Sequence, residues 1–326
     1  MEVIKPYLKY FLEHLVAHPL TKEPKNLYSP GDYILALGGK RIRPLMVLMT
    51  CEGYGRDKSA ALNASMCVEV FHNFTLLHDD IMDQASLRRG QDTVHIKYGL
   101  NTGILTGDVM LIQSYQYLLN YNDPQLIKSL LDVFNKMAFE VCEGQQMDMD
   151  FETSNTVSIA DYIKMISLKT SVLLAASAQM GAIIAGADAI QQGHIYAFAL
   201  NLGIAFQLHD DVLDIYGASA QVGKKIGGDI LQNKKTYLYI KSLELADESQ
   251  LEKLKYYYQS EFIGDEDKKI IVVTDIFRSL NVIEYSRQVI EAYKDLAISH
   301  LDASGLDTST KSKLLKFSEE LMKREY

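Results

Sequence analysis

The distribution of proline is the feature that most constrains the fold of this chain. All six prolines lie between Pro6 and Pro124 in a chain of 326 residues, and none follows. Proline breaks helix interiors because it lacks an N–H group and clashes with the preceding turn. A long proline-free stretch with apolar residues at helical spacing predicts many helices joined by short turns. Strand-like alternation with hairpin turns does not recur, so we predict an all-α fold.

Individual helix starts can be read from capping patterns. Ser158 and Asp161 form an S-x-x-D pattern before an apolar run, and Asp307 begins a second capping stretch. Pro44 is expected in the first turn of a helix, where proline is tolerated. No linker rich in serine, glycine or proline divides the sequence. We therefore predict a single domain over residues 1–326.

The composition limits which binding partners and which cellular compartment we expect. The chain has 33 Lys and Arg against 42 Asp and Glu, a net charge of −9, so we expect no nucleic-acid partner. Cys51, Cys67 and Cys142 form no CxxC pair, which indicates free thiols in a reducing compartment. The uncharged stretch 170–187 is rich in alanine and is interpreted as a buried core helix. We expect a cytoplasmic protein with no secretory signal and no transmembrane segment.

Two acidic clusters carry the predicted chemistry. Residues 79–83 read DDIMD and residues 210–214 read DDVLD, each at the end of a predicted helix. Side chains three and four residues apart share one side of a helix, so each cluster gathers carboxylates that repel one another. Mg²⁺ prefers one or two carboxylates completed by water and phosphate. A single cluster could be a solvated helix end, whereas two copies predict magnesium sites that face each other around a diphosphate.

Basic residues accompany both clusters. The segment GGKRIRP at 38–44 leads into a predicted helix start, where backbone N–H groups and the helix dipole favour anions. Arg88 and Arg89 follow the first cluster, and the segment GKKIGGD at 223–229 follows the second. Each alone is typical of a solvated surface charge. Together with the acidic clusters they indicate sites for phosphorylated substrates.

These motifs, in this order, resemble the trans-prenyltransferase (polyprenyl synthetase) family, which includes farnesyl and geranylgeranyl diphosphate synthases. Further matching segments are GQQMD at 144–148, Lys169 with Thr170, FQLHDDVLD at 206–214, and Lys234. The chain departs from the family where Asp92 replaces a common proline and Asn233 a frequent glycine. The resemblance implies a helical bundle of the terpenoid synthase type with a central active-site cavity, and a homodimer.

The resemblance also assigns roles to individual residues. It implies about three Mg²⁺ ions, bound directly by Asp79, Asp83 and Asp210, with Asp80, Asp211 and Asp214 ligating or orienting waters and Asp148 in support. Arg88, Lys169, Lys224 or Lys225, and Lys234 are then expected to bind the allylic diphosphate, which can be dimethylallyl, geranyl or farnesyl diphosphate. Lys40, Arg43, His72 and Arg89 are expected to bind isopentenyl diphosphate, and Thr170 and Gln207 to face the allylic cation. His72 taken alone would be a core histidine.

Product length is expected to depend on the residues before the first cluster. In the family, side chains four, five and eight positions before the first aspartate form the floor of the product tunnel, and here these are Thr75, Phe74 and Phe71. An aromatic at the fifth position without one at the fourth resembles C20 synthases. We therefore favour geranylgeranyl diphosphate, with farnesyl diphosphate (C15) as the alternative and longer chains less favoured. Both phenylalanines could instead be ordinary core residues.

Three other classes of function are alternatives to a chain-elongating prenyltransferase. A terpene cyclase of the same fold would use one allylic diphosphate, but such enzymes usually carry an Asn/Ser/Glu triad as their second motif. A non-catalytic regulatory subunit would tend to lose aspartates, and none is lost here. His78 and His209 precede the aspartate pairs, as in metal-dependent phosphohydrolases, yet those enzymes use histidine as a metal ligand.

Overall fold

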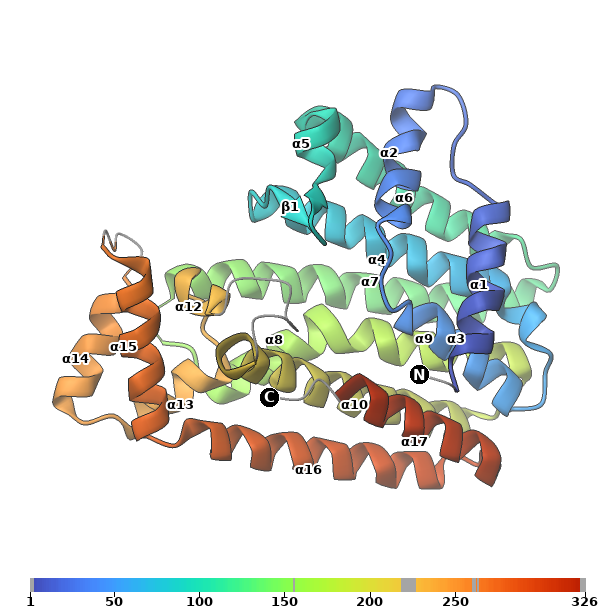
Figure 1. Cartoon of the computed structure of the whole chain (residues 1–326). Helices are drawn as coiled ribbons and strands as arrows, with labels where there is room; N and C mark the ends of the chain where they lie inside the picture. Colours follow the sequence, from blue (N-terminus) through green and yellow to red (C-terminus); the bar gives the residue numbers. More distant parts are fainter. Residues whose placement is uncertain (1–2, 155, 218–226, 260–261, 263, 323–326) are drawn as a thin grey trace. The chain divides into compact units, whose positions relative to one another are not determined.

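The computed structural model describes residues 3–154, 156–217, 227–259, 262 and 264–322, and most of them are helical (Figure 1). The first part of the chain forms α1 (Lys5–Ala17), α2 (Lys25–Ala36), α3 (Ile42–Gly53), η1 (Lys58–Ala61), α4 (Leu62–Met82), α5 (Val94–Tyr98), α6 (Leu100–Leu119) and α7 (Pro124–Thr153). It continues as α8 (Ile159–Ile166), η2 (Ser167–Ser171), α9 (Val172–Ala185), α10 (Ala189–Tyr216), α12 (Gly228–Leu231), α13 (Tyr237–Leu245), α14 (Glu248–Tyr257), α15 (Glu266–Ser279), α16 (Val282–Ala303) and α17 (Thr308–Met322). Within the described ranges, the strands are β1 (Leu87–Arg88) and β2 (Gln91–Asp92), which pair antiparallel. The all-α prediction is confirmed.

The chain forms two compact units. The first unit comprises Met1–Lys136, Leu173–Tyr196 and Leu301–Phe317, and the second comprises Met137–Val172, Ala197–His300 and Ser318–Tyr326. Each unit is assembled from segments that are distant in the sequence, and helices such as α7 and α10 contribute residues to both. The single domain expected from the sequence remains a prediction.

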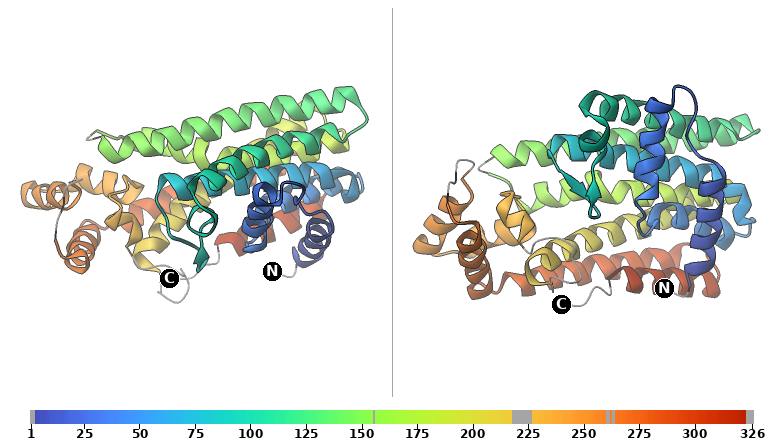
Figure 2. Two further views of the ribbon diagram at one scale, coloured as in Figure 1. Left: turned by 90° about the horizontal axis from the view of Figure 1, so that it is seen from above. Right: turned by 45° about the horizontal axis from the view of Figure 1, so that its top comes forward.

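The first unit is organised around α4. This helix buries residues on most of its sides, including Met66, Val70, Phe71 and Leu77. Helix α6 runs alongside it, as Figures 1 and 2 show, and α3 packs against another side. Burial of its apolar side chains supplies most of the stability of such a helix, because each large side chain removed from water adds about 1.5–3 kcal/mol to the free energy of unfolding. The C-terminal end of this well-fixed helix carries the first acidic cluster.

The second unit has its own apolar core. Residues of α8, the second half of α10 and helices α13 to α16 pack together there, with Ile166, Leu208, Val212, Leu238 and Phe277 among the buried side chains. The capping box predicted at the start of α8 is confirmed. Ser158 Oγ accepts the Asp161 N–H at 3.1 Å, and the Asp161 carboxylate accepts the Ser158 N–H at 3.1 Å.

The long apolar stretch around α9 forms a core helix. Among the described residues, Ile159–Ala185 is the segment long and apolar enough to cross a membrane, and 67% of its most apolar window is buried. A Cβ added to Gly181 would lie 2.0 Å from Thr50 Oγ1 and 2.4 Å from the Val47 carbonyl oxygen. The missing side chain therefore lets α9 approach α3 closely. Both observations agree with the interpretation of this stretch as a core helix.

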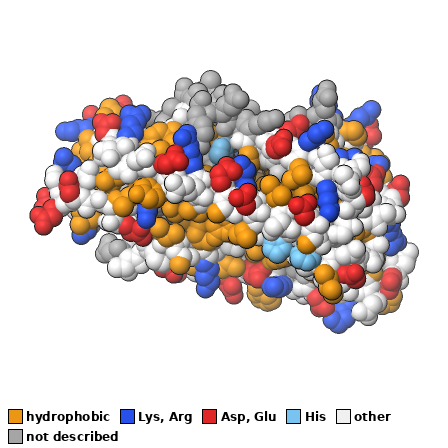
Figure 3. Space-filling view, turned by 90° about the horizontal axis from the view of Figure 1, so that it is seen from below, with side chains coloured by type: hydrophobic (Ala, Val, Ile, Leu, Met, Phe, Trp, Pro, Cys, Tyr) orange, Lys and Arg blue, Asp and Glu red, His pale blue; other side chains and the backbone are white. Residues whose placement is uncertain are grey.

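The surface mixes charges of both signs. Figure 3 shows lysine, arginine, aspartate and glutamate side chains interspersed on one face of the molecule, with apolar side chains between them.

Candidate active site

The first acidic cluster lies at the C-terminal end of α4, in the first unit. Asp80 is buried at 3% exposure and accepts two hydrogen bonds from Arg88, from Nε to Oδ2 at 2.7 Å and from Nη2 to Oδ1 at 2.8 Å. Burial raises the pKa of Asp80, and the Arg88 guanidinium opposes that rise. Asp79 is half-buried, 3.8 Å from Arg88 Nη2, and Asp83 is exposed. The cluster therefore has a buried middle aspartate and two more accessible outer ones.

The second acidic cluster repeats this arrangement at the C-terminal end of α10, in the second unit. Asp211 is buried at 5% exposure and accepts hydrogen bonds from the Tyr162 hydroxyl and from Gln207 Nε2, the latter at 3.0 Å. Burial and the charge of Asp229 raise the pKa of Asp211 well above its usual range, while these hydrogen bonds lower it. Asp210 and Asp214 are half-buried. Asp214 Oδ2 accepts the Asp229 N–H at 3.0 Å.

A basic group in the first unit brings together the residues predicted to bind isopentenyl diphosphate. Arg43 Nη1 lies 3.1 Å from His72 Nε2. Burial lowers the pKa of His72 well below its usual range, and the charges of Arg43 and Arg89 lower it further. The imidazole is therefore neutral and can accept a hydrogen bond from Arg43.

The glycine loop before α3 completes this basic group. Arg89 donates to the Gly38 carbonyl, and a Cβ added to Gly39 would lie 2.7 Å from the Arg89 guanidinium. Gly39 also has φ +123°, in the region that favours glycine. Lys40 follows directly in the sequence. The loop therefore places the Arg89 guanidinium next to Gly39, the residue before Lys40.

Sequence reasoning overlooked the ion pair that supports this group. Arg41 and Glu69 are buried, and Arg41 donates to the Glu69 carboxylate and to the Leu35 carbonyl. Glu69 Oε1 also accepts a hydrogen bond from Asn73 Nδ2 at 2.9 Å. A glutamate within an apolar run was the available signal, because a buried carboxylate requires a partner. The pair fixes the start of α3 against α4 and so positions Arg43 beside His72.

Lys169 and Thr170 lie in η2, a π-helical turn between α8 and α9. Such turns are rare and occur frequently at functional sites. Lys169 Nζ lies 2.5 Å from Asp148 Oδ2 on α7. A Cβ on Gly144 would lie 2.2 Å from the Lys169 backbone nitrogen, so α7 and η2 pack backbone against backbone. Thr170 Oγ1 donates to Gln207 Oε1 at 3.4 Å, which connects Thr170 through Gln207 to the second acidic cluster.

The segment before α13 explains one departure from the family pattern. Asn233 has φ +56°, in the left-handed region that glycine and asparagine tolerate best. Its side-chain oxygen accepts a hydrogen bond from the buried Lys269 at 2.6 Å, and the next residue is Lys234, whose N–H donates to the Asp229 carbonyl at 2.9 Å. Lys224 and Lys225, also expected to bind phosphate, lie outside the described residues.

The residues predicted to set product length lie on α4, in the turns before Asp79. Phe71 is fully buried, and its ring centroid lies 5.2 Å from that of Phe134 on α7. Phe74 is the less enclosed of the two phenylalanines, with its centroid 5.5 Å from Phe71 and 4.9 Å from His78. Thr75 is half-buried and donates from Oγ1 to the His72 carbonyl at 2.8 Å. Phe71 is thus a core residue, and Phe74 is the better candidate for a tunnel floor.

The donor set of the acidic clusters fits magnesium. Over the ranges that the structure describes, no group of three histidine, cysteine, aspartate or glutamate residues is arranged to hold an ion. Magnesium sites commonly use one or two carboxylates and take their remaining ligands from water and substrate phosphate, as the outer aspartates would allow. The His78 ring lies against α6, with Nε2 3.2 Å from the Ile104 carbonyl oxygen. This placement disfavours the phosphohydrolase alternative, which needs histidine on the metal.

Comparisons with known proteins agree on one family. The model of the family described as polyprenyl synthetase matches residues 24–274. A geranylgeranyl pyrophosphate synthase of Geoglobus acetivorans is 34% identical over all of this chain and 99% of that protein. A crystal structure of a geranylgeranyl pyrophosphate synthase has a TM-score of 0.94 and 47% identity, covering 99% of each chain. The synthase of Corynebacterium glutamicum, solved with isoprenyl diphosphate and magnesium, has a TM-score of 0.84 and 25% identity, covering 99% of this chain and 98% of that one.

Proposed function

Because the chain belongs to the polyprenyl synthetase family and has its all-α isoprenoid synthase fold, we propose that it condenses isopentenyl diphosphate with an allylic diphosphate to give an all-trans polyprenyl diphosphate. It is a prenyltransferase, and geranylgeranyl diphosphate is the favoured product. The observation that carries this conclusion is the pair of aspartate clusters at the ends of α4 and α10. Each has a buried, hydrogen-bonded middle carboxylate and outer carboxylates that remain accessible.

The outer aspartates would hold magnesium, about three ions per site. Asp79, Asp83 and Asp210 are the proposed direct ligands, with Asp214 ligating or orienting water. Bound magnesium would stabilise the negative charge that develops on the departing diphosphate. Asp80 and Asp211 position their clusters, because each is fixed by side chains from another element, Arg88 and Tyr162 respectively.

The allylic diphosphate is bound by basic side chains beside both clusters. Arg88 has five N–H donors, so it can hold Asp80 and still donate to a phosphate oxygen. Lys169, supported by Asp148, and Lys234, whose backbone is fixed by Asp229, are the proposed partners in the second unit. Lys224 or Lys225 is proposed to contribute a further contact.

Isopentenyl diphosphate is assigned to Lys40, Arg43, His72 and Arg89. The neutral His72 orients Arg43, and the glycine loop places Arg89 near the start of α3. The oxygens of Thr170 and Gln207 would face the allylic carbocation, which the double bond of isopentenyl diphosphate attacks before a proton is lost. Water must be excluded there, because it would quench the cation.

A direct assay tests the proposed function. The protein is incubated with radiolabelled isopentenyl diphosphate, Mg²⁺ and each of dimethylallyl, geranyl and farnesyl diphosphate. We expect label in a C20 diphosphate, and none when EDTA removes the metal. A product that ends at C15 would support the farnesyl diphosphate alternative. Conversion of an allylic diphosphate to a hydrocarbon without isopentenyl diphosphate would indicate a cyclase, and the absence of any product would contradict the proposal.

We also propose a cytoplasmic homodimer. Leu105, Ile112 and Leu119 are exposed at heptad spacing on α6, and Ile112 is 65% exposed. Such a stripe of apolar side chains is typical of a helix that packs against a second chain.

Sedimentation equilibrium tests the homodimer with two variants. We expect Ile112→Glu to sediment as a monomer, because a charge buried at the interface would be unpaired. The matched substitution Ile271→Glu, at another exposed isoleucine on α15, should stay dimeric. A dimeric Ile112→Glu variant would exclude this face of α6 as the interface.

A further inference from the structure

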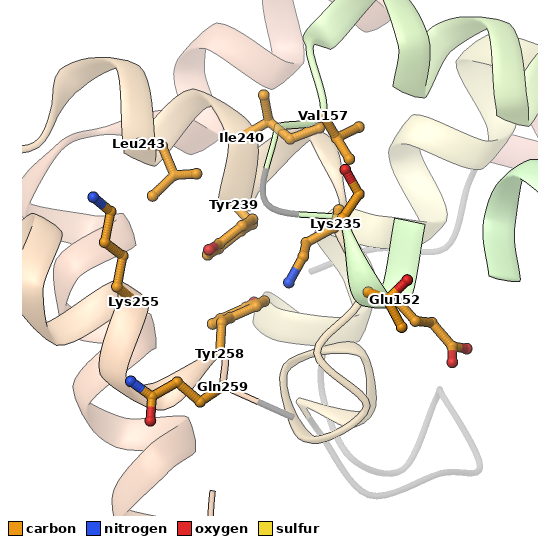
Figure 4. Close-up of a pocket in the computed structure, with 11 residues that line it drawn as sticks. Glu152, Val157, Lys235, Tyr239, Ile240, Leu243, Lys255, Tyr258 and Gln259 are labelled. Atoms are coloured by element: carbon orange, nitrogen blue, oxygen red, sulfur yellow. The ribbon is translucent and has the colours of Figure 1, made fainter. Parts of the chain in front are cut away.

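The second unit contains a cavity that the proposed chemistry does not use. Its volume is about 540 Å³, and it lies between the end of α7, helix α13 and helix α14 (Figure 4). The lining residues are Glu152, Thr153, Ser154, Val157, Lys235, Tyr239, Ile240, Leu243, Lys255, Tyr258 and Gln259. Ligand pockets commonly have volumes of about 300–1,000 Å³. The cavity is therefore large enough for a small organic ligand.

Two amines give the cavity a positive character. Neither Lys235 nor Lys255 forms an ion pair with a carboxylate of the described residues. Glu152 is the acidic residue of the lining, and Figure 4 shows its carboxylate directed away from Lys235. Burial lowers the pKa of Lys235, because partial loss of water disfavours the charged amine. An anion in the cavity would offset that cost.

A pair of stacked tyrosines lies beside Lys235 at the cavity wall. The rings of Tyr239 and Tyr258 stack with centroids 3.8 Å apart and an angle of 17° between their planes. Lys235 Nζ lies 5.1 Å from each centroid, so the amine sits beside the stack, level with the gap between the two rings. The stacked rings form a wall next to the amine, which leaves it fewer conformations to lose when a ligand binds.

The remaining wall of the cavity is aliphatic. Val157, Ile240 and Leu243 line it, and Figure 4 shows Lys255 beyond Leu243, on the side of Tyr239 opposite Lys235. Because the two tyrosine rings already stack on each other, no slot for an aromatic base lies between them. Cations on two sides and an aliphatic wall are complementary to an anion that carries a flexible apolar chain.

The position of the cavity connects it to the proposed active site. Lys235 directly follows Lys234, and Thr153 ends the helix that carries Asp148. A ligand here would thus touch two elements that hold proposed diphosphate-binding residues.

We propose that this cavity is a second binding site for an isoprenyl diphosphate, separate from the catalytic one. Lys235 binds the diphosphate, Lys255 on the other side of Tyr239 adds positive charge to the cavity, and Val157, Ile240 and Leu243 contact the prenyl chain. The chemical class of the ligand rests on the proposed function, since the enzyme makes such molecules.

Equilibrium dialysis of the full-length protein with radiolabelled geranylgeranyl diphosphate and Mg²⁺ tests the proposal. We expect two molecules bound per chain for the wild type. Lys255→Glu should weaken binding at the second site by about tenfold, because a positive charge facing the anionic ligand is replaced by a negative one. Lys253→Glu makes the same charge change two residues away on α14 without lining the cavity, and it should still bind two.

Two further measurements test which parts of the ligand the second site recognises and whether Lys235 is needed for binding. Inorganic diphosphate and geranylgeraniol should each fail to displace label from the second site at concentrations where geranylgeranyl diphosphate does. Lys235→Met should lose the second site while retaining its helical circular dichroism. One molecule bound by the wild type, an unchanged affinity of the second site in Lys255→Glu, or equal competition by inorganic diphosphate would overturn the proposal. Turnover of the wild type is measured separately, so a failure of the proposed catalytic function would be recognised on its own.

Discussion

Replacing Asp79 by alanine is expected to lower kcat about a hundred- to thousandfold. This is the effect of removing one preorganised electrostatic contact to a developing charge, about 3–4 kcal/mol. Asp210→Ala should act in the same way from the second cluster. Both carboxylates are half-buried at helix ends, so their removal should leave the helical packing intact. Steady-state assays with saturating substrates, together with circular dichroism, measure both properties.

A matched control distinguishes loss of a metal ligand from a general effect of removing an acidic side chain. Asp302→Ala removes an exposed carboxylate near the end of α16 and should retain wild-type kcat. Isothermal titration of Mg²⁺ with a non-reactive diphosphate adds a second readout, in which Asp79→Ala and Asp210→Ala should bind more weakly. Near-normal turnover in either variant would refute the metal assignment.

Phe74→Ala is expected to shift the product from C20 to longer chains. Phe74 lies five residues before Asp79, about 7.5 Å along α4 at a rise of roughly 1.5 Å per residue. It is less enclosed than Phe71, so its removal would open space beside α4 for further isoprene units. Product chain length is measured by chromatography of the dephosphorylated prenols.

The cost of a large-to-small substitution has to be controlled in this experiment. Removing a buried phenylalanine typically destabilises a protein by about 3–5 kcal/mol. Phe74→Leu retains more volume and should give a smaller lengthening with better retained thermal stability. Phe139→Ala, at an exposed phenylalanine on α7, should leave the product at C20. An unchanged product in a folded Phe74→Ala variant would reject Phe74 as the floor.

The helical architecture could be predicted because its signals are local. The absence of proline after Pro124 is compatible with the many helices from α7 onward, and Ser158 and Asp161 form the predicted capping box. Helical periodicity and capping depend on residues three or four apart, so they are present in the sequence itself. The two-residue β-hairpin and the π-helical turn at Lys169 were not predicted, because neither has a strong local signal.

The composition of the site could also be predicted, but its internal contacts could not. Spacing alone indicated which aspartates form each cluster. Tyr162, which holds Asp211, and Glu69, which holds Arg41, lie 49 and 28 residues from their partners, and nothing in the sequence pairs them. Tertiary packing brings such residues together, and they determine the orientation of their functional neighbours.

The sequence by itself therefore determined the helices, the acidic clusters and the class of chemistry, because these depend on residue type and short-range spacing. The tertiary structure alone decided which carboxylate of each cluster is buried and which remain accessible to metal. Burial depends on the elements that pack against a helix end, here the hairpin carrying Arg88 and the helix carrying Tyr162. The cavity beside Lys235 has the same origin, since it is formed by residues of α7, α13 and α14 that are remote in the chain.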